Sequence, residues 1–219
     1  MAFLTIERDG GILTATMNQP ETRNALTGNT AVQEFVQLCE DVRKDASVKV
    51  LIITAAGPIF SSGGNVKDMK RFFDDALTPD LIRQEYRPGI QQIPNALVQL
   101  DVPVICAING PAIGAGLDLT CMCDIRIASE TATFAESFVR VGIVPGDGGA
   151  WLLPRAVGMA KASEMAFTGE PISAQEALAC GLVSRVVAAD QLLPTARALA
   201  AKIAANPGAS GFQNRFTGN

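Results

Sequence analysis

The decapeptide NGPAIGAGLD, Asn109–Asp118, follows an apolar run typical of a strand, Val102–Ile108, and opens an apolar run typical of a helix. This order predicts a strand, a glycine turn and the start of a helix. The first turn of a helix leaves backbone N–H groups without partners, and their dipoles sum to a partial positive charge. Such a junction can hold an oxygen atom that is becoming negative. Asp118 lies about one turn into the predicted helix, close to whatever the N–H groups bind.

A second junction of the same kind comes earlier in the chain. Val50–Ala55 has the continuous apolar pattern of a buried strand, and Gly57–Asn65 is a Gly/Ser-rich loop. Taken singly, each loop is better explained as a tight turn. Taken together, the two loops can each point one N–H at the same oxygen. Two converging amides form an oxyanion hole, which stabilises charge developing on a carbonyl by about 3–4 kcal/mol per donor.

Length and charge limit the class of protein. The chain has 219 residues, enough for a sizeable core and suited to one domain with a short appendage. It carries 22 Asp and Glu against 18 Lys and Arg, without a basic stripe, which argues against nucleic acid as the main ligand. The N-terminus lacks a secretory signal pattern, and no apolar run approaches the roughly 18–20 residues of a membrane span. We expect a cytoplasmic protein with no nucleic-acid or membrane partner.

Histidine is absent from the chain, which narrows the possible chemistry. Ser-His-Asp and Cys-His mechanisms have no base, so proton transfer falls to carboxylates, lysine, tyrosine or water. The five cysteines are an odd number in apolar surroundings, which favours reduced core thiols over a disulfide framework. Cys121 and Cys123 are two residues apart, but there is no second cysteine pair at zinc spacing. We expect no metal site.

Five motifs follow one another along the chain, namely Asn18–Leu26 (NQPETRNAL), Phe60–Met69 (FSSGGNVKDM), Asn109–Asp118, Val141–Gly149 (VGIVPGDGG) and Thr168–Val183. Their order and spacing resemble those of the enoyl-CoA hydratase/isomerase (crotonase) family. The resemblance covers residues 3 to about 205. It implies an enzyme that stabilises the enolate of an acyl-CoA thioester, with coenzyme A as part of the substrate and no separate cofactor.

Apolar periodicity predicts alternating strands and helices after an N-terminal hairpin that turns at Gly10. Strands are expected at residues 3–8, 12–17, 50–55, 104–108, 125–128, 133–135 and 184–187, and helices at 27–45, 66–73, 114–122, 152–168, 173–180 and 192–205. The polar stretch 74–89 is expected to be a loop leading into a helix that ends at Leu100. This alternation is typical of a largely parallel α/β core. The resemblance implies a β-β-α superhelix in each subunit and a homotrimer or dimer of trimers.

By resemblance, the two oxyanion amides belong to Gly64 and Ala115. Both residues are small, so neither side chain crowds a ligand. The adenosine end of coenzyme A would lie along the loop 55–65, where Ser62, Gly63 and Asn65 are the expected contacts. Arg23 and Lys67 are candidates for its phosphates, although a lone basic residue is more often a solvated surface group.

The sequence departs from the hydratases of this family at their two glutamates. The first position is Asp118, and the second, counted back from Gly142, is Phe138. Adding water takes one carboxylate to orient it and another to deliver a proton, so Phe138 favours double-bond isomerisation over hydration. A hydratase, and a member that binds acyl-CoA without turnover, remain alternatives.

Asp118 is the first candidate for the proton-transfer group, and Asp147 is the second. Asp147 precedes the two glycines at which a helix is expected to begin, so it could equally be a helix N-cap. Glu136 is expected on the same strand face as Phe138, as a surface or supporting carboxylate.

The C-terminal stretch 206–219 contains Pro207, Gly208 and Gly211, which break helices. We expect residues 1–205 to form the acyl-CoA-binding core and 206–219 a short tail. By resemblance, the helices that usually follow in this family are absent or not recorded here. The expected consequences are a more open acyl pocket and a less well supported trimer.

Overall fold

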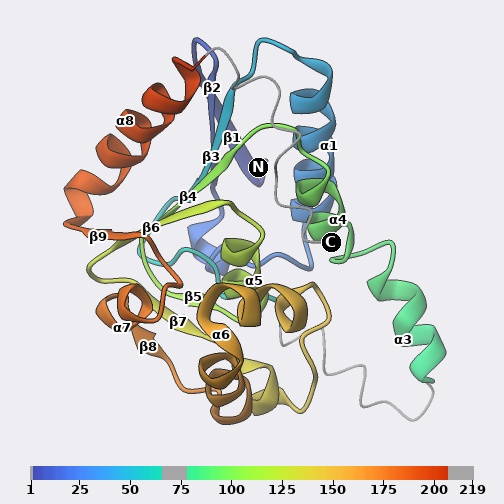
Figure 1. The fold of residues 1–219 in the computed structure, drawn as a ribbon. Coiled ribbons are helices and arrows are strands. Elements are labelled where there is room, and N and C mark those ends of the chain that lie inside the picture. Colours follow the sequence, from blue (N-terminus) through green and yellow to red (C-terminus); the bar gives the residue numbers. More distant parts are fainter. Residues whose placement is uncertain (1, 66–77, 207–219) are drawn as a thin grey trace.

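A six-stranded sheet forms the centre of the molecule (Figure 1). The computed structural model describes residues 2–65 and 78–206, and its large sheet has the strand order β1-β2-β3-β4-β6-β9. β1 and β2 form the predicted antiparallel hairpin, and each later neighbour pairs in parallel. The strands are Leu4–Asp9 (β1), Ile12–Met17 (β2), Val50–Ala55 (β3), Val104–Ile108 (β4), Ile125–Ser129 (β6) and Arg185–Val187 (β9).

Both faces of β3 are buried. Leu51 and Ile53 belong to the larger of two hydrophobic cores, whereas Val50 and Ile52 belong to the smaller. Successive side chains of a strand point to opposite faces, so a strand covered on both sides reads as a continuous apolar run. This explains why the sequence predicted β3 correctly.

Helices cover the two faces of the large sheet. Figure 1 shows α8 (Leu192–Ala204) on one side of the sheet, with α1 (Ala31–Lys44) and α4 (Gln92–Val98) on the other. The fully inward residues of α8 are four apart, which places them in one stripe facing the sheet: Leu192, Ala196 and Ala200.

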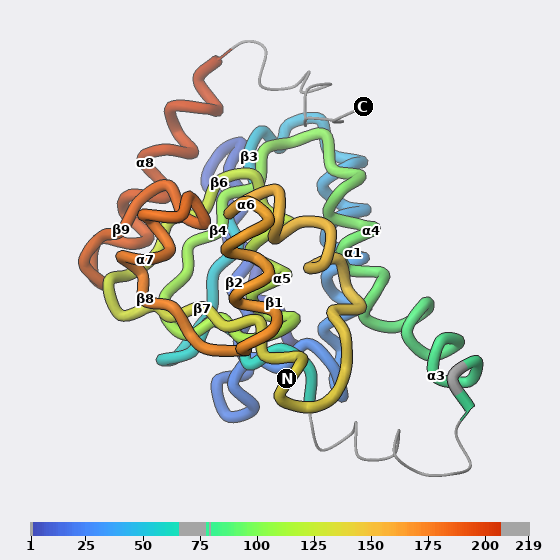
Figure 2. Tube along the Cα trace, turned by 60° about the horizontal axis from the view of Figure 1, so that its bottom comes forward, coloured from blue at the N-terminus to red at the C-terminus, as the bar shows by residue number. Residues whose placement is uncertain are grey.

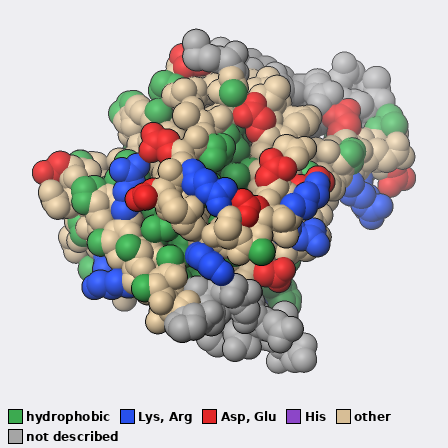
Figure 3. Space-filling view, turned by 90° about the horizontal axis from the view of Figure 1, so that it is seen from above, with side chains coloured by type: hydrophobic (Ala, Val, Ile, Leu, Met, Phe, Trp, Pro, Cys, Tyr) green, Lys and Arg blue, Asp and Glu red, His purple; other side chains and the backbone are tan. Residues whose placement is uncertain are grey.

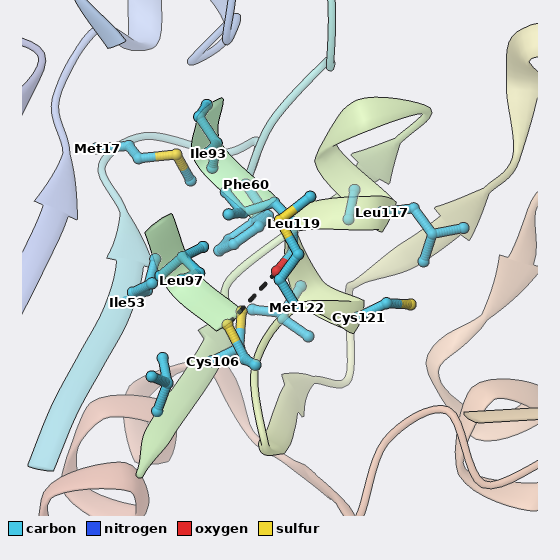
Figure 4. Close-up of a cluster of buried hydrophobic side chains, with 14 of the residues drawn as sticks. Met17, Ile53, Phe60, Ile93, Leu97, Cys106, Leu117, Leu119, Cys121 and Met122 are labelled. Atoms are coloured by element: carbon cyan, nitrogen blue, oxygen red, sulfur yellow. Dashed lines mark hydrogen bonds between the residues drawn. The ribbon is translucent and has the colours of Figure 1, made fainter. Parts of the chain in front are cut away.

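The larger core reaches from the sheet to the loop after β3. Phe60 of that loop is fully buried and packs in this core together with Ile93 and Leu119 (Figure 4). Cys106 and Cys121 lie in the same core, and none of the five cysteines, all of them among the described residues, forms a disulfide, which confirms the prediction of reduced cysteines. A buried aromatic ring of this size anchors the loop whose backbone continues into the candidate site.

A second, three-stranded sheet lies beyond the carboxyl ends of the large one. It consists of β5 (Ala112–Ile113), β7 (Thr133–Ala135) and β8 (Ile172–Ser173), in the order β5-β7-β8. The helices around it are α5 (Ala115–Cys121), α6 (Gly149–Thr168) and α7 (Ala174–Ala179). α6 packs against α5, and Gly158 interrupts it with a non-helical φ of 78°. The crotonase-like α/β fold expected from the resemblance is therefore confirmed in its main elements.

One predicted loop is wrong. Within the stretch 74–89, residues Pro79–Tyr86 form the helix α3, whose first turn is capped by the Thr78 hydroxyl accepting from the Leu81 amide (3.4 Å). Thr at the N-cap followed by Pro at the first helical position is a helix-start signal that outweighs the polar composition. Figures 1 and 2 both show α3 projecting from the body of the molecule. The predicted helix 66–73 and the tail beyond residue 206 lie outside the described residues.

Charges of both signs are mixed at the end of the molecule that carries the β1–β2 turn. Figure 3 looks onto this end, where Lys and Arg side chains lie among Asp and Glu. The ion pairs Arg8–Asp45 and Lys44–Glu40 belong to it and are exposed. Among residues 2–65 and 78–206, none of the helices has both the length and the apolar character of a membrane span.

Candidate active site

Two loops, one after β3 and one after β4, are bonded to each other at the carboxyl ends of these strands. The amides of Phe60 and Ser61 donate to the Pro111 carbonyl (3.1 and 3.2 Å), and the Ile113 amide donates to the Ser61 carbonyl (3.0 Å). Glycine is required at position 116, since a Cβ on Gly116 would lie 2.5 Å from the Ser61 carbonyl oxygen. The first loop is thereby fixed against the start of α5.

Asn24 holds the first loop from the other side. Its side-chain amide donates to the carbonyls of Ala56 (3.0 Å) and Ile59 (2.9 Å). Its own carbonyl accepts from the Ser61 hydroxyl (2.8 Å), which in turn accepts from the Gly63 amide (3.1 Å). Asn24 is fully buried with a left-handed φ of 50°, which asparagine adopts more readily than most residues. The loop is therefore held on both sides before it reaches the site.

Gly63 allows two backbone amides to approach each other. Its φ is +78°, and a Cβ at this position would lie 2.5 Å from the Ile113 carbonyl oxygen and 3.0 Å from the Ala115 nitrogen. The next residue, Gly64, borders the same cavity as Ala115. Neither amide donates a hydrogen bond to any residue that the structure describes. Two unpartnered N–H donors beside one cavity are what an oxyanion hole requires.

The cavity has a volume of about 420 Å³, which suits a small organic group. Its wall combines the two amide-bearing loops with parts of α1, α3 and the segment before α6. The lining residues are Thr27, Gly28, Asn29, Val32, Gly64, Asn65, Glu85, Tyr86, Gly89, Ile90, Ala115, Phe138 and Asp147.

Three buried carboxyl groups lie at the inner side of this site. Asp118, Glu136 and Asp147 expose only 0, 1 and 3% of their surface. Asp147 borders the cavity, and the other two do not. The Asp118 carboxyl lies over the first residue of α6, because a Cβ on Gly149 would be 2.0 Å from its Oδ1. Both Asp118 oxygens lack a donor among the described residues, as does Oε2 of Glu136.

The pKa values of all three carboxyls are raised. Burial is the main cause, and for Asp118 the charges of Asp147 and Glu136 add to it, so the pKa of Asp118 lies well above its ordinary 3.8. Burial also raises the pKa of Asp147, and that of Glu136 from 4.5 to about 7. The interaction with the Asp118 carboxyl lowers the pKa of each of these two groups. The cluster therefore retains at least one proton at neutral pH.

Phe138 occupies the part of the cavity wall next to Ala115. Its ring lies over Gly114, where a Cβ would be 3.7 Å from the ring edge. It belongs to a short 3-10 helix, Ser137–Val141, that follows β7. The residue that the resemblance aligns with the second hydratase acid thus presents a hydrocarbon ring to the cavity.

The sequence profile of the enoyl-CoA hydratase/isomerase family matches residues 7–213. This chain belongs to the enoyl-CoA hydratase/isomerase family. A probable enoyl-CoA hydratase of Mycobacterium bovis is 36% identical over 201 residues, which cover 91% of this chain and 74% of that protein. The 1,2-epoxyphenylacetyl-CoA isomerase of Escherichia coli is 34% identical over 210 residues, covering 94% and 78%. The crystal structure of an enoyl-CoA hydratase from Bacillus anthracis has a TM-score of 0.85 at 32% identity, covering 94% and 78%.

The structure brings together several residues that the sequence proposed for this family's site. Gly64, Ala115, Asn65 and Asp147 all border the cavity, while Asp118 lies behind it. The Asn65 amide is held by the Thr27 hydroxyl, to which it donates (2.8 Å). The predicted amide pair and one predicted carboxyl therefore share one space.

The other predicted coenzyme A contacts stand apart from the cavity lining. Ser62 and Gly63 come just before Gly64 in the same loop but do not line the cavity. The Ser62 amide donates to the Arg23 carbonyl (3.0 Å). The Arg23 side chain is exposed. Lys67 lies outside the described residues.

Two expectations about carboxylates need correction. Glu136 is not on a strand face with Phe138, because β7 ends at Ala135 and the chain then turns into the 3-10 helix, which buries the Glu136 side chain. Asp147 is not the N-cap of α6, because Gly148 takes that position and receives no side-chain cap.

Tyr86 is a cavity residue that the sequence reasoning missed. Burial and the charge of Asp147 raise its pKa, so it stays a phenol at neutral pH. The only sequence signal for it was an aromatic residue at the end of a polar stretch. Within the described part of the chain, no three His, Cys, Asp or Glu side chains are grouped so as to hold a metal ion.

Proposed function

We propose that this protein shifts a carbon–carbon double bond in an enoyl-CoA, moving it into conjugation with the thioester. The observation that carries the proposal is the cavity wall itself. Gly64 and Ala115, whose amides have no partner among the described residues, line it together with a buried carboxyl, Asp147, and with the phenyl ring of Phe138, which the resemblance aligns with the second acid of the hydratases.

The proposed reaction needs one proton-carrying group. The thioester oxygen accepts hydrogen bonds from the amides of Gly64 and Ala115. The Asp147 carboxylate removes a proton from C2 of a 3-enoyl-CoA, and the electron pair moves onto that oxygen to form the enolate. Asp147 then returns the proton to C4, and the pair reforms the double bond between C2 and C3. No water is consumed, and the enzyme ends in its starting protonation state.

The first test compares isomerisation with hydration in the same protein. We expect a 3-enoyl-CoA to become conjugated about 100-fold faster than a trans-2-enoyl-CoA is hydrated, since a positioned acid is worth on the order of 100- to 10,000-fold in rate. Both reactions are followed by the ultraviolet absorbance of the conjugated thioester, which rises in the first and falls in the second. The Phe138→Glu variant, which supplies a carboxyl at this position, should increase hydration relative to isomerisation.

Faster hydration than isomerisation in the wild type would refute the proposal and favour the hydratase that several relatives are named for. No turnover of either substrate, with acyl-CoA binding retained, would favour a non-catalytic family member. A panel of short, medium and aryl acyl groups keeps a narrow substrate preference from being mistaken for inactivity.

We further propose a cytoplasmic homotrimer or dimer of trimers, as the resemblance implies. Support comes from large apolar side chains exposed along α6, the 3-10 helix before it and the segment that joins them, namely Val139, Val144, Trp151, Met159 and Phe167. A monomer gains nothing from exposing these side chains, whereas a subunit interface would bury them.

The second test is the oligomeric state. We expect sedimentation equilibrium to give a multiple of the 23.0 kDa chain mass, and Phe167→Glu to shift the protein toward the monomer. Val98→Glu serves as the matched control, because Val98 is also exposed but belongs to α4 and not to α6. A wild-type monomer, or equal dissociation by both variants, contradicts assembly through α6.

A further inference from the structure

Two of the three buried carboxyls have no part in the proton transfer proposed above. Asp118 and Glu136 are as inaccessible as core residues, and neither borders the cavity. An ionised carboxylate can only accept hydrogen bonds, yet neither oxygen of Asp118 meets a donor among the described residues. Burying an ionised carboxylate without hydrogen-bond donors costs free energy, so the protonation state of Asp118 has to be explained.

A proton held within the cluster resolves the lack of donors. If Asp118 is neutral, its O–H can donate to a carboxylate oxygen of Asp147 or Glu136, since both of these carboxyls interact electrostatically with Asp118. The negative charge that remains lies close to the N-terminus of α6, because Asp118 packs directly on Gly149. The partial positive charge of that helix end stabilises an anion there.

We infer that Asp118 and Glu136 form a buried, proton-sharing pair behind Asp147, and that Glu136 is a positioning residue for the reaction at Asp147. The inference rests on the proposed function only in naming that reaction. In this arrangement Asp118 is the hydrogen-bond donor that orients the Asp147 carboxylate toward the cavity. Glu136 is the second acceptor for the Asp118 O–H group. When Glu136 is protonated, Asp118 donates to Asp147, and when Glu136 is ionised, it competes with Asp147 for that hydrogen bond.

The groups that face this pair are few. Asp147 stands on the cavity side, with the phenol of Tyr86 next to it. Cys121 of α5 faces both Asp118 and Glu136, and burial raises the pKa of its thiol to about 12, so it stays neutral between pH 5 and 8. Glu136, with its pKa of about 7, changes charge in that range.

Urea unfolding as a function of pH tests the pair without any substrate. The folded protein keeps a proton on Glu136 up to about pH 7, whereas the unfolded chain releases it near 4.5. The folded state therefore binds more protons between these two values, and its stability falls as the pH rises through them. We expect the urea midpoint of the wild type to drop from pH 5 to pH 8, because the raised pKa values of Asp118 and Glu136 both contribute, and Glu136→Gln to lose the part of the drop that Glu136 causes. Glu130→Gln is the matched control, since Glu130 is exposed on the turn after β6 and should behave as the wild type.

The pH profile of kcat/KM then tests the positioning role. Glu136 ionises near pH 7 and then competes with Asp147 for the Asp118 proton, so kcat/KM of the wild type should fall above this pH, and Glu136→Gln, which cannot ionise, should lose that limb. A merely structural role would lower the whole profile without moving its limb. Asp118→Asn, which keeps a donor that cannot titrate, should retain most of the rate that Asp118→Leu loses.

Three results would overturn the inference: a urea midpoint in Glu136→Gln with the same pH dependence as Glu130→Gln, a limb near pH 7 that Glu136→Gln keeps, or equal losses in Asp118→Asn and Asp118→Leu. If Glu136→Gln does not fold, the comparison of the two Asp118 variants decides. A wild type that hydrates and does not isomerise refutes the proposed function alone, because the urea experiment still reports on the pair.

Discussion

Asp147→Asn is expected to lower kcat for isomerisation by about 100- to 10,000-fold, the usual range for a group that transfers a proton in the transition state. The amide nearly preserves the size of the side chain but cannot accept a proton. Its replacement also removes the cavity-facing charge that raises the pKa of Tyr86, so the tyrosine should titrate at lower pH in the variant. The rate is measured with saturating 3-enoyl-CoA, and the tyrosine titration by ultraviolet absorbance.

Two further carboxyls serve as comparisons for Asp147. Asp118→Asn leaves a hydrogen-bond donor behind Asp147 and should cost about tenfold or less. Glu85 also borders the cavity, from α3, so Glu85→Gln measures what the loss of a cavity charge does by itself. If Asp118→Asn or Glu85→Gln abolishes turnover while Asp147→Asn retains it, the proton-transfer role belongs to that other residue.

The large sheet could be predicted from the sequence because each of its strands has a local signal. β3 and β4 read as apolar runs since both of their faces are covered, and the glycine turn of the N-terminal hairpin sets the β1–β2 register. The helix α8 could be predicted because its buried residues recur every four positions, as they do in a helix that buries one face.

Of the small sheet only β7 was predicted, because β5 and β8 have almost no local pattern. β5 and β8 contain two residues each and exist only because β7 pairs with both of them. The burial of Glu136 has the same origin. Its side chain turns inward because β7 ends one residue earlier, and that end point depends on its pairing with β5 and β8.

For the two amides of the site, the positions in the chain were predictable, whereas their closeness in space was not. Their positions in the chain follow from a strand, a glycine-rich loop and a helix start, all of which are local patterns. That they border one cavity depends on contacts between distant segments, such as the Leu26 amide donating to the Gly63 carbonyl (2.8 Å). Phe138 was located by counting back from Gly142, but only the structure places its ring against the second loop at Gly114.

Removing either amide of the proposed oxyanion hole should reduce kcat by about 100- to 1,000-fold, or roughly 3–4 kcal/mol in the transition state. Proline replaces the N–H by the Cδ of its ring and is tolerated where its fixed φ is accepted. Ala115 is the better place for this change, because it is the first residue of α5, a position that proline favours in helices. Ala115→Pro should therefore unfold close to the wild-type temperature and still bind coenzyme A.

Gly64→Pro removes the other donor and should show a loss of the same order, with Ala115→Gly as the control that keeps its N–H. The charge on the thioester oxygen is larger in the enolate than in the substrate, so the loss should appear in kcat more than in KM. Ground-state binding, measured by calorimetry with a non-reactive acyl-CoA, should change far less than the rate. A folded Ala115→Pro protein with an unchanged kcat would show that this amide does not contact the reacting oxygen, and the proposed mechanism would then lose the donor on which it depends.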